Sequence, residues 1–156
     1  MFEELKTILI AMTPICELRG AIPIALFQYD LSLLSAFFYS VLGNMIPGIF
    51  LLLYLEKASN FLSSKSQFFK RIFEWFFNKT RKKHSQRFEK SKTLALALFV
   101  AIPLPVTGVW TGSVCAFLFD IPFKKALPAI FTGVIIAGII ITMLSLGIIN
   151  FNNLII

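Results

Sequence analysis

Charged side chains are missing from three long stretches of this chain. No Asp, Glu, Lys or Arg occurs in residues 31–55, 93–119 or 126–156, and the mean hydropathy of the whole chain is +0.80. Each stretch exceeds the about 20 apolar residues that a helix needs to cross a bilayer. A soluble domain of this length spreads its charges along the sequence. The distribution therefore excludes an ordinary soluble fold and predicts an all-α integral membrane protein, with residues 1–156 as a single membrane domain.

Residues that carry most enzyme chemistry are scarce. The one histidine, His84, lies in the basic run RKKHSQR, where we expect a solvated loop residue. Cys16 and Cys115 stand in apolar surroundings without a C-x-x-C motif, which favours small buried side chains over a disulfide or a metal site. The apolar stretches contain no H-E-x-x-H motif and no pair of carboxylates. We therefore predict that the protein is not an enzyme and has no catalytic residue, metal or cofactor.

Positive charge is concentrated in the middle of the chain. The net charge is +7, and eleven of the 15 Lys and Arg residues lie between Lys57 and Lys92. Such a bias marks a cytoplasmic loop of a membrane protein, so we expect no nucleic-acid partner. Phenylalanines recur there at helical spacing among the basic residues. The pattern predicts a basic amphipathic helix over residues 56–92 that lies on the membrane and contacts anionic lipid headgroups.

The stretch TPICELRGAIP, residues 13–23, places an acid and a base, Glu17 and Arg19, inside an apolar segment. It also contains Pro14, Gly20 and Pro23, which predict that the helix is broken over residues 13–20. Residues 5–28 are too few for two full crossings, so they form one span at most or a helical hairpin that enters and returns. A charged pair at a break within the membrane indicates a functional site.

A second break is predicted in the uncharged residues 93–119, at Pro103, Pro105, Gly108 and Gly112. Lys124 and Lys125 follow this stretch, and the positive-inside rule favours the cytoplasm for them. They reach it if residues 93–119 form a re-entrant hairpin that does not cross the membrane. The last span then runs from Ala126 to about residue 149. We expect a multi-pass protein of the inner membrane with both termini outside.

An internal repeat supports this topology. When the sequence is aligned with itself at a shift of 90 positions, several residues within 27–50 are identical to their partners. Among them are Asp30 with Asp120, Gly43 with Gly133 and Gly48 with Gly138. We expect both aspartates to be helix N-caps. Each half contains a hairpin, an aspartate and a spanning helix, so the two halves predict inverted-topology repeats over 1–55 and 93–156, joined by the basic helix. Inverted repeats with broken helices are the architecture of secondary transporters.

The motifs TPICELRGAIPIAL and PLPVTGVWTGS resemble the small multidrug export protein family over essentially the whole chain. That family distantly resembles the DedA/VTT membrane proteins, which share paired re-entrant hairpins. The first resemblance implies a small inner-membrane transporter. The second implies traffic of lipid carriers such as polyprenyl phosphates. This chain departs from the DedA pattern because its second hairpin contains no arginine.

Glu17 is the candidate proton carrier, because removal from water favours the neutral form of a carboxyl. Arg19 suits an anionic substrate, since its planar fork matches carboxylate or phosphate. The alternative for both residues is a structural ion pair. Thr107, Trp110 and Thr111 are candidates for the opposite wall of a substrate site, although Gly108 and Gly112 also form a G-x-x-x-G motif typical of helix packing.

The combined prediction is a proton-coupled secondary transporter with its substrate between the two hairpin tips. The substrate is a small molecule or a lipid, and a homodimer is expected because two spanning helices offer little surface to cover two broken hairpins. Two alternatives remain: a lipid or polyprenyl-phosphate flippase or scramblase of DedA-like type, and a membrane scaffold or assembly factor without a transport cycle.

Overall fold

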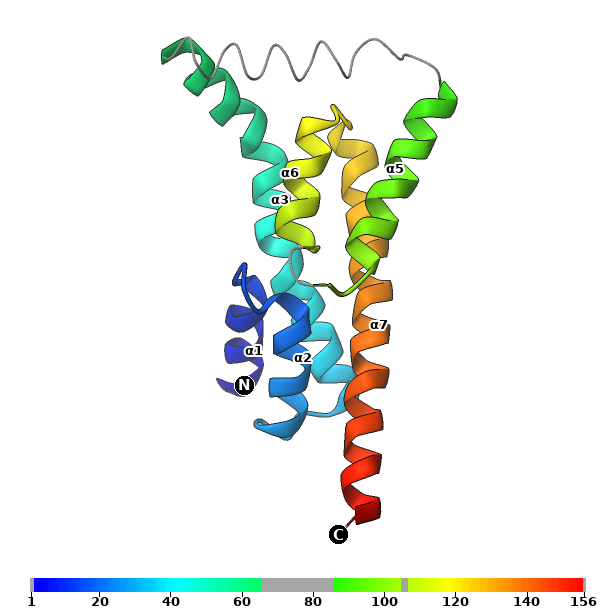
Figure 1. Ribbon diagram of the computed structural model, residues 1–156. Coiled ribbons are helices and arrows are strands. Elements are labelled where there is room, and N and C mark those ends of the chain that lie inside the picture. Colours follow the sequence, from blue (N-terminus) through cyan, green and yellow to red (C-terminus); the bar gives the residue numbers. More distant parts are fainter. Residues whose placement is uncertain (1, 66–85, 105–106, 156) are drawn as a thin grey trace.

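The computed structural model describes residues 2–65, 86–104 and 107–155, and this part of the chain is entirely helical. The predicted all-α fold is therefore confirmed. The helices, drawn in Figure 1, are α1 (Phe2–Met12), α2 (Glu17–Phe27), α3 (Leu33–Lys65), α5 (Gln86–Ala101), α6 (Val109–Leu118) and α7 (Phe123–Ile155).

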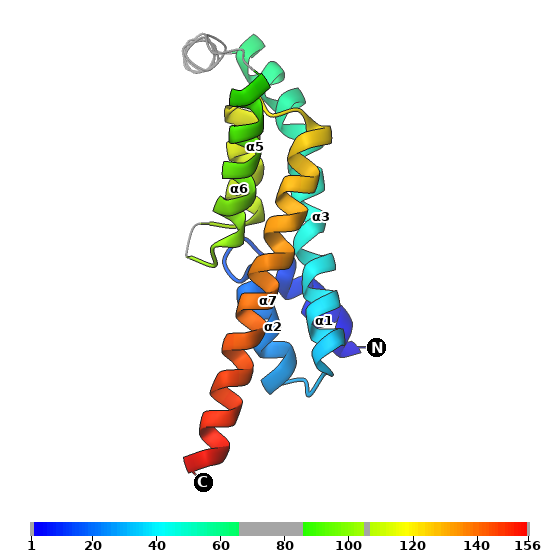
Figure 2. The ribbon, with the colours of Figure 1, turned by 90° about the vertical axis from the view of Figure 1, so that its right-hand side faces the viewer.

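Two helices, α3 and α7, are long and apolar enough to cross a membrane. Their apolar portions are Leu33–Leu55 and Phe123–Gly147, of 23 and 25 residues. The two helices pack against each other and run in opposite directions along the molecule (Figures 1 and 2). The last turn of α3 and the first turn of α5 lie at one end, and both chain termini lie toward the other (Figure 1). The spans predicted at 31–55 and from Ala126 onward thus coincide with α3 and α7.

The boundaries of the predicted basic helix over 56–92 are wrong. Residues 56–65 continue α3, and residues 86–92 belong to α5. The sequence between Leu55 and Lys65 contains no glycine or proline, so the backbone stays helical although its hydropathy changes. Residues 66–85, including His84, lie outside the described part of the chain.

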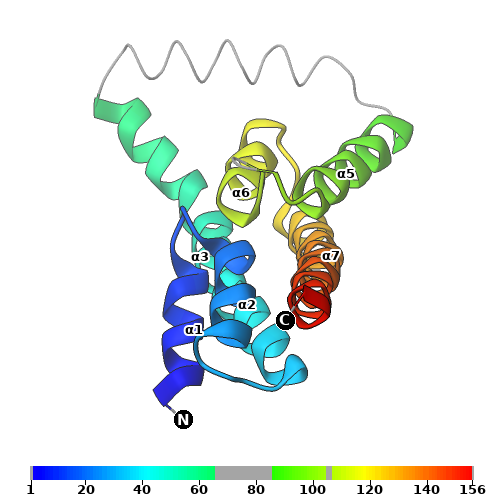
Figure 3. The same cartoon turned by 60° about the horizontal axis from the view of Figure 1, so that its bottom comes forward.

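The other four helices form two pairs at opposite ends of α3 and α7. Helices α1 and α2 pack beside the end where α3 begins, and α5 and α6 pack beside the end where α7 begins (Figures 1 and 2). The turn of each pair points toward the middle of the molecule, so the two turns approach each other (Figure 1). Seen from the end in Figure 3, α1 and α2 lie side by side next to α3.

The predicted breaks differ in part from the observed turns. The first turn contains Pro14 and ends before Glu17, whereas Gly20 and Pro23 lie inside α2. The second turn contains Pro103 and ends at Gly108, whereas Gly112 lies inside α6. Pro105 is outside the described residues.

Hydrogen bonding and packing explain why those three residues do not break their helices. The N–H of Gly20 still donates to Cys16 O at 2.9 Å, and the N–H of Gly112 to Gly108 O at 2.8 Å. Pro23 removes one donor and its ring crowds the carbonyl four residues earlier, yet α2 continues to Phe27. Gly112 is needed for close packing, because a Cβ there would lie 2.6 Å from a methyl group of Val100.

The sequence predicted that Asp30 and Asp120 are helix N-caps, and this prediction is wrong. Both have a left-handed backbone, with φ of 48° and 55°, and both follow the end of a helix, α2 or α6. After α6 the N–H of Asp120 donates to Phe117 O at 3.1 Å and that of Ile121 to Ala116 O at 2.9 Å, which is a Schellman ending. Aspartate adopts this conformation more readily than most residues, so it replaces the usual glycine.

Candidate functional site

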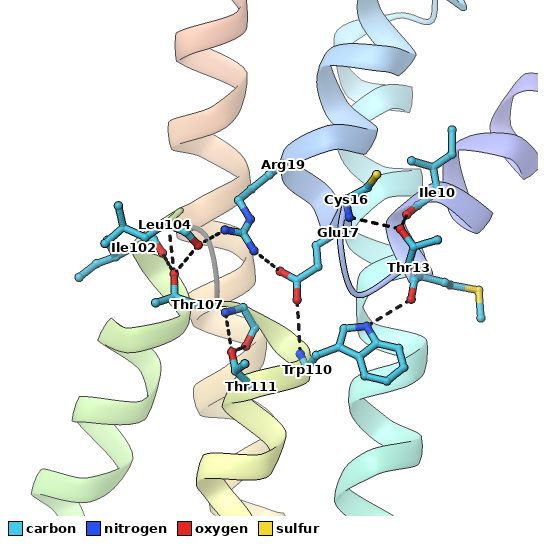
Figure 4. Close-up of polar contacts among 12 residues, drawn as sticks. Ile10, Thr13, Cys16, Glu17, Arg19, Ile102, Leu104, Thr107, Trp110 and Thr111 are labelled. Carbon is cyan, nitrogen blue, oxygen red and sulfur yellow. Dashed lines mark hydrogen bonds and ion pairs between the residues drawn. The ribbon is translucent and has the colours of Figure 1, made fainter.

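The site begins at Glu17, which is the first residue of α2 and is only 3% exposed. Its φ of 47° is left-handed, a conformation that costs an ordinary residue about 1–2 kcal/mol. The turn before it is held by Thr13, whose hydroxyl donates to Ile10 O at 2.7 Å and accepts from Cys16 N at 3.3 Å (Figure 4). Backbone strain of this kind persists where the surrounding contacts hold the residue in place, and it is frequent at functional sites.

The Glu17 carboxylate reaches across to the beginning of α6 in the other helix pair. Its Oε1 accepts a hydrogen bond from the backbone N–H of Trp110 at 3.5 Å (Figure 4). Gly108 makes this approach possible, because a Cβ there would lie 2.5 Å from the Glu17 carboxyl carbon and would overlap Oε2. The φ of Gly108 is 170°, an extended value open to any residue, so glycine is needed here for space. Glu17 therefore supplies a negative charge to the N-terminus of α6, where the helix dipole favours one.

Arg19 pairs with the same carboxylate and also contacts the turn between α5 and α6. Its Nη2 lies 3.0 Å from Glu17 Oε2, and its Nη1 donates to the carbonyl of Leu104 (Figure 4). Residues two apart on a regular helix do not face each other, and Glu17 meets Arg19 because it stands at the distorted start of α2. The side chains of Arg19 and Glu17 are 18% and 4% exposed. The predicted ion pair exists, and it connects the two turns through both of its members.

The two candidate threonines shape the second turn. The hydroxyl of Thr107 accepts from Leu104 N at 3.1 Å and has two acceptors within reach of its proton, Ile102 O at 2.5 Å and Leu104 O at 2.9 Å, the carbonyl that Arg19 also contacts. The hydroxyl of Thr111 accepts from Gly108 N at 3.2 Å. These threonines hold the backbone that receives Arg19 and Glu17, and they lie with them in one cluster (Figure 4).

Trp110 is the remaining candidate residue. It lies in the first turn of α6 and contacts both helix pairs. Its backbone N–H donates to Glu17, and its indole Nε1 donates to Met12 O at 3.2 Å (Figure 4). Trp110 therefore ties the start of α6 to the end of α1 and to the start of α2. The structure brings all five candidate residues, Glu17, Arg19, Thr107, Trp110 and Thr111, to the meeting point of the two turns.

A cavity of about 420 Å³ adjoins Trp110 and was not predicted from the sequence. It is lined by residues of α1, α3 and α6: Met12, Ile46, Pro47, Phe50, Leu51, Tyr54, Leu55 and Trp110. Its volume falls within the range of about 300–1,000 Å³ that is usual for small-molecule sites. The sequence feature nearest to this cavity is the Pro47-Gly48 pair inside the apolar stretch 31–55. A Cβ at Gly48 would overlap Val109, so this glycine lets α6 pack closely on α3.

The chemistry at the turns is that of an ion pair and hydrogen-bond donors. Within the described residues no three His, Cys, Asp or Glu side chains group as metal ligands. The polar groups at hand are one carboxylate, one guanidinium, the first N–H groups of α6 and the carbonyls of Leu104 and Met12. This set can bind and release a proton at Glu17 or exchange the partner of Arg19 for another anion.

The described residues are entirely helical, and two apolar helices with a buried ion pair between two helix turns are typical of helical membrane proteins with a polar site in their interior. The family described as "Putative small multi-drug export protein" matches residues 17–140. The chain belongs to this family, whose name indicates export of small molecules across a membrane. No curated protein and no solved structure matches the chain.

Proposed function

We propose that this protein is a proton-coupled secondary transporter of the inner membrane, with its substrate site between the turns of α1–α2 and α5–α6. The observation that carries the proposal is the position of Glu17, whose carboxylate contacts Arg19 in its own helix and the start of α6 in the other helix pair. A group that can take up a proton thus contributes directly to the contact between the two halves of the molecule.

Proton uptake by Glu17 would change this junction directly. The ionised carboxylate attracts the Arg19 guanidinium and the positive end of the α6 dipole. The neutral acid keeps its hydrogen-bonding oxygen but loses both charge attractions. The contact between the helix pairs therefore weakens when Glu17 is protonated, and Arg19 becomes available to another anion. Differential stabilisation of two arrangements by a bound proton is the requirement for coupled transport.

We propose that the two helix pairs are re-entrant hairpins in inverted repeats. Several paired features support this interpretation. The spanning helices α3 and α7 each have 33 residues, and each follows an aspartate with a left-handed backbone. A Cβ at Gly43 would overlap the backbone of α1, and a Cβ at Gly133 would lie 2.7 Å from Ala97 O in α5. Glycines 90 positions apart thus let each span contact the first arm of its own hairpin.

The proposed topology places residues 56–92 in the cytoplasm near anionic lipid headgroups and both termini outside. It is supported by the position of the end of α3, the start of α5 and the start of α7 at one end of the molecule (Figure 1). A homodimer is proposed as well, because the outer faces of α1 and α5 are apolar and exposed. These faces carry Leu5, Leu9, Leu94 and Leu98.

A lipid or polyprenyl-phosphate flippase is the second candidate. The observation in its favour is Arg19, which can hold a phosphate through its planar fork once Glu17 is neutral. A scaffold without a transport cycle is the third. It differs from both in that it should tolerate Glu17→Gln without loss of function.

Purified protein in liposomes with a pH gradient tests the proposal. Ethidium and fluorescein serve as a cationic and an anionic probe, and a pH-sensitive dye reports proton movement. We expect probe movement to be accompanied by proton flux in the wild type and to lose its dependence on the gradient in Glu17→Gln. Glu3→Gln is the matched control, since Glu3 is an exposed acid paired with Lys6 on α1. Equal proton flux in Glu17→Gln and Glu3→Gln would contradict the proposal.

A further inference from the structure

The cavity between α1, α3 and α6, here called the α3 groove, is a second part of the site with a different chemistry. Its lining contains no charged residue. Two of its aromatic side chains, Phe50 and Tyr54, stack with ring centroids 5.9 Å apart. A groove with such walls suits hydrocarbon chains and flat ring systems, and it contains no charged side chain that would pair with an ion.

The α3 groove opens sideways on the surface of a membrane span. Phe50 and Tyr54 lie within the apolar portion of α3, and their side chains are 59% and 54% exposed. In a bilayer Phe50 on this face of α3 meets lipid chains, and Tyr54 lies in the last turn of the apolar portion, so the groove is accessible to a molecule that is dissolved in the bilayer.

Trp110 connects the α3 groove to the charged pair. Trp110 lines the groove, and its backbone N–H donates to Glu17. Met12 also lines the groove, and its carbonyl accepts from the Trp110 indole at 3.2 Å. Trp110 thus lies between the apolar groove and the buried acid and base, Glu17 and Arg19.

We propose that the α3 groove binds the apolar part of an amphiphilic substrate that enters from the bilayer, while the polar part of the substrate is directed past Trp110 toward Glu17 and Arg19. The inference rests on the proposed transport function and specifies its substrate class, namely molecules with an apolar chain or ring system and one polar end. It adds Ile46, Phe50, Leu51 and Tyr54 of α3 to the substrate-contacting residues.

A fluorescence experiment tests binding without any transport. Trp110 is one of two tryptophans, so Trp75→Phe leaves it as the sole reporter. The protein is placed in nanodiscs of unbrominated phospholipid, and the probes are a dibromo fatty acid and a dibromo alkyl trimethylammonium. Bromine quenches tryptophan emission at short range. We expect saturable quenching of Trp110 that the unbrominated form of the same probe reverses. Comparison of the two probes shows which charge the polar compartment accepts.

Two residues of α3 provide a matched comparison. Phe50 lines the α3 groove, whereas Phe38 does not, and their exposed fractions are 59% and 58%. Phe50→Ala should weaken saturable quenching about tenfold, as expected when an aromatic contact is removed from a binding site, and Phe38→Ala should leave it unchanged. Leu51→Phe, which fills the groove, should weaken it as well and serves if Phe50→Ala does not fold.

Three results would overturn the inference. Quenching that rises in proportion to the probe without saturation would show ordinary contact with lipid. Equal effects of Phe50→Ala and Phe38→Ala would show that the groove is not the site. A change of particle mass in Phe50→Ala, with no effect of the probe on wild-type emission, would show that a second copy covers the groove. The quenching is measured without a pH gradient, whereas proton coupling is measured as proton flux in liposomes. Failure of proton coupling and failure of groove binding are therefore separate outcomes.

Discussion

A methyl group at Gly108 would test the central contact of the site with the smallest possible change. A Cβ there would overlap Glu17 Oε2, so Gly108→Ala must displace the carboxylate from the start of α6. Because φ is 170°, alanine adopts the backbone conformation without strain. The variant therefore reports the contacts of the carboxylate and not a distorted turn.

The expected cost follows from those contacts. The carboxylate is the movable end of a side chain, so it avoids the new methyl group by leaving Trp110 N and weakening its pair with Arg19. A hydrogen bond to a charged group contributes about 1.5–3 kcal/mol to the free energy of unfolding, and we expect a loss in that range. For a chain of this length the loss lowers the melting temperature by about 3–12 °C.

The assay combines thermal unfolding in detergent, followed by circular dichroism, with proton flux in liposomes. Gly147→Ala is the control, since a Cβ at Gly147 meets no atom within 4 Å. The double variant Gly108→Ala, Glu17→Asp should recover part of both stability and flux, because aspartate is shorter and draws the carboxylate away from the new methyl group. If Gly108→Ala changes the melting temperature no more than Gly147→Ala, Glu17 does not depend on its contact with α6.

Three further predictions follow from other contacts. Glu17→Gln should lower the free energy of unfolding by only about 1–2 kcal/mol, because Arg19 keeps its hydrogen bond to the Leu104 carbonyl. Loss of one member of a buried ion pair that leaves the other without any partner costs about 3–5 kcal/mol. A larger loss in denaturant titration, restored by adding Arg19→Met with transport intact, would show that the pair is only structural. Asn44→Leu should raise the free energy of unfolding by about 1–3 kcal/mol, because Asn44 is 1% exposed and its amide has no hydrogen-bond partner among the described residues. A lower melting temperature of this variant would refute the prediction. A cysteine at Lys124 should react with an impermeant thiol reagent only from the cytoplasmic side and one at Asn152 only from outside; labelling of position 124 from outside would exclude the re-entrant arrangement.

The spanning helices and the charged pair are features that the sequence determined by itself. Residues 31–55 and the stretch from Ala126 coincide with apolar portions of α3 and α7, because hydropathy and the absence of charge are local properties of a segment. Glu17 and Arg19 were recognisable as a pair because a bilayer makes isolated charges costly, so two opposite charges near a turn attract each other. The residue types alone carried both conclusions.

The roles of the small residues and aspartates required the tertiary structure. Glycine serves a break, a helix end or a close contact equally well, and its neighbours in space decide among them. Gly112 lies inside α6 against Val100, whereas Gly108 ends the turn and makes room for Glu17. Asp30 and Asp120 end α2 and α6, although an aspartate before an apolar run is also typical of an N-cap.

The α3 groove and the contact of Glu17 with α6 also depended on the fold. Glu17 and Trp110 are 93 positions apart, and Met12 and Trp110 are 98 apart. Hydropathy along the chain carries no information about which turn meets which. The two turns approach because α3 and α7 run in opposite directions and hold one helix pair at each end. That packing turns a broken helix with a charged pair into a junction between the two halves of the protein.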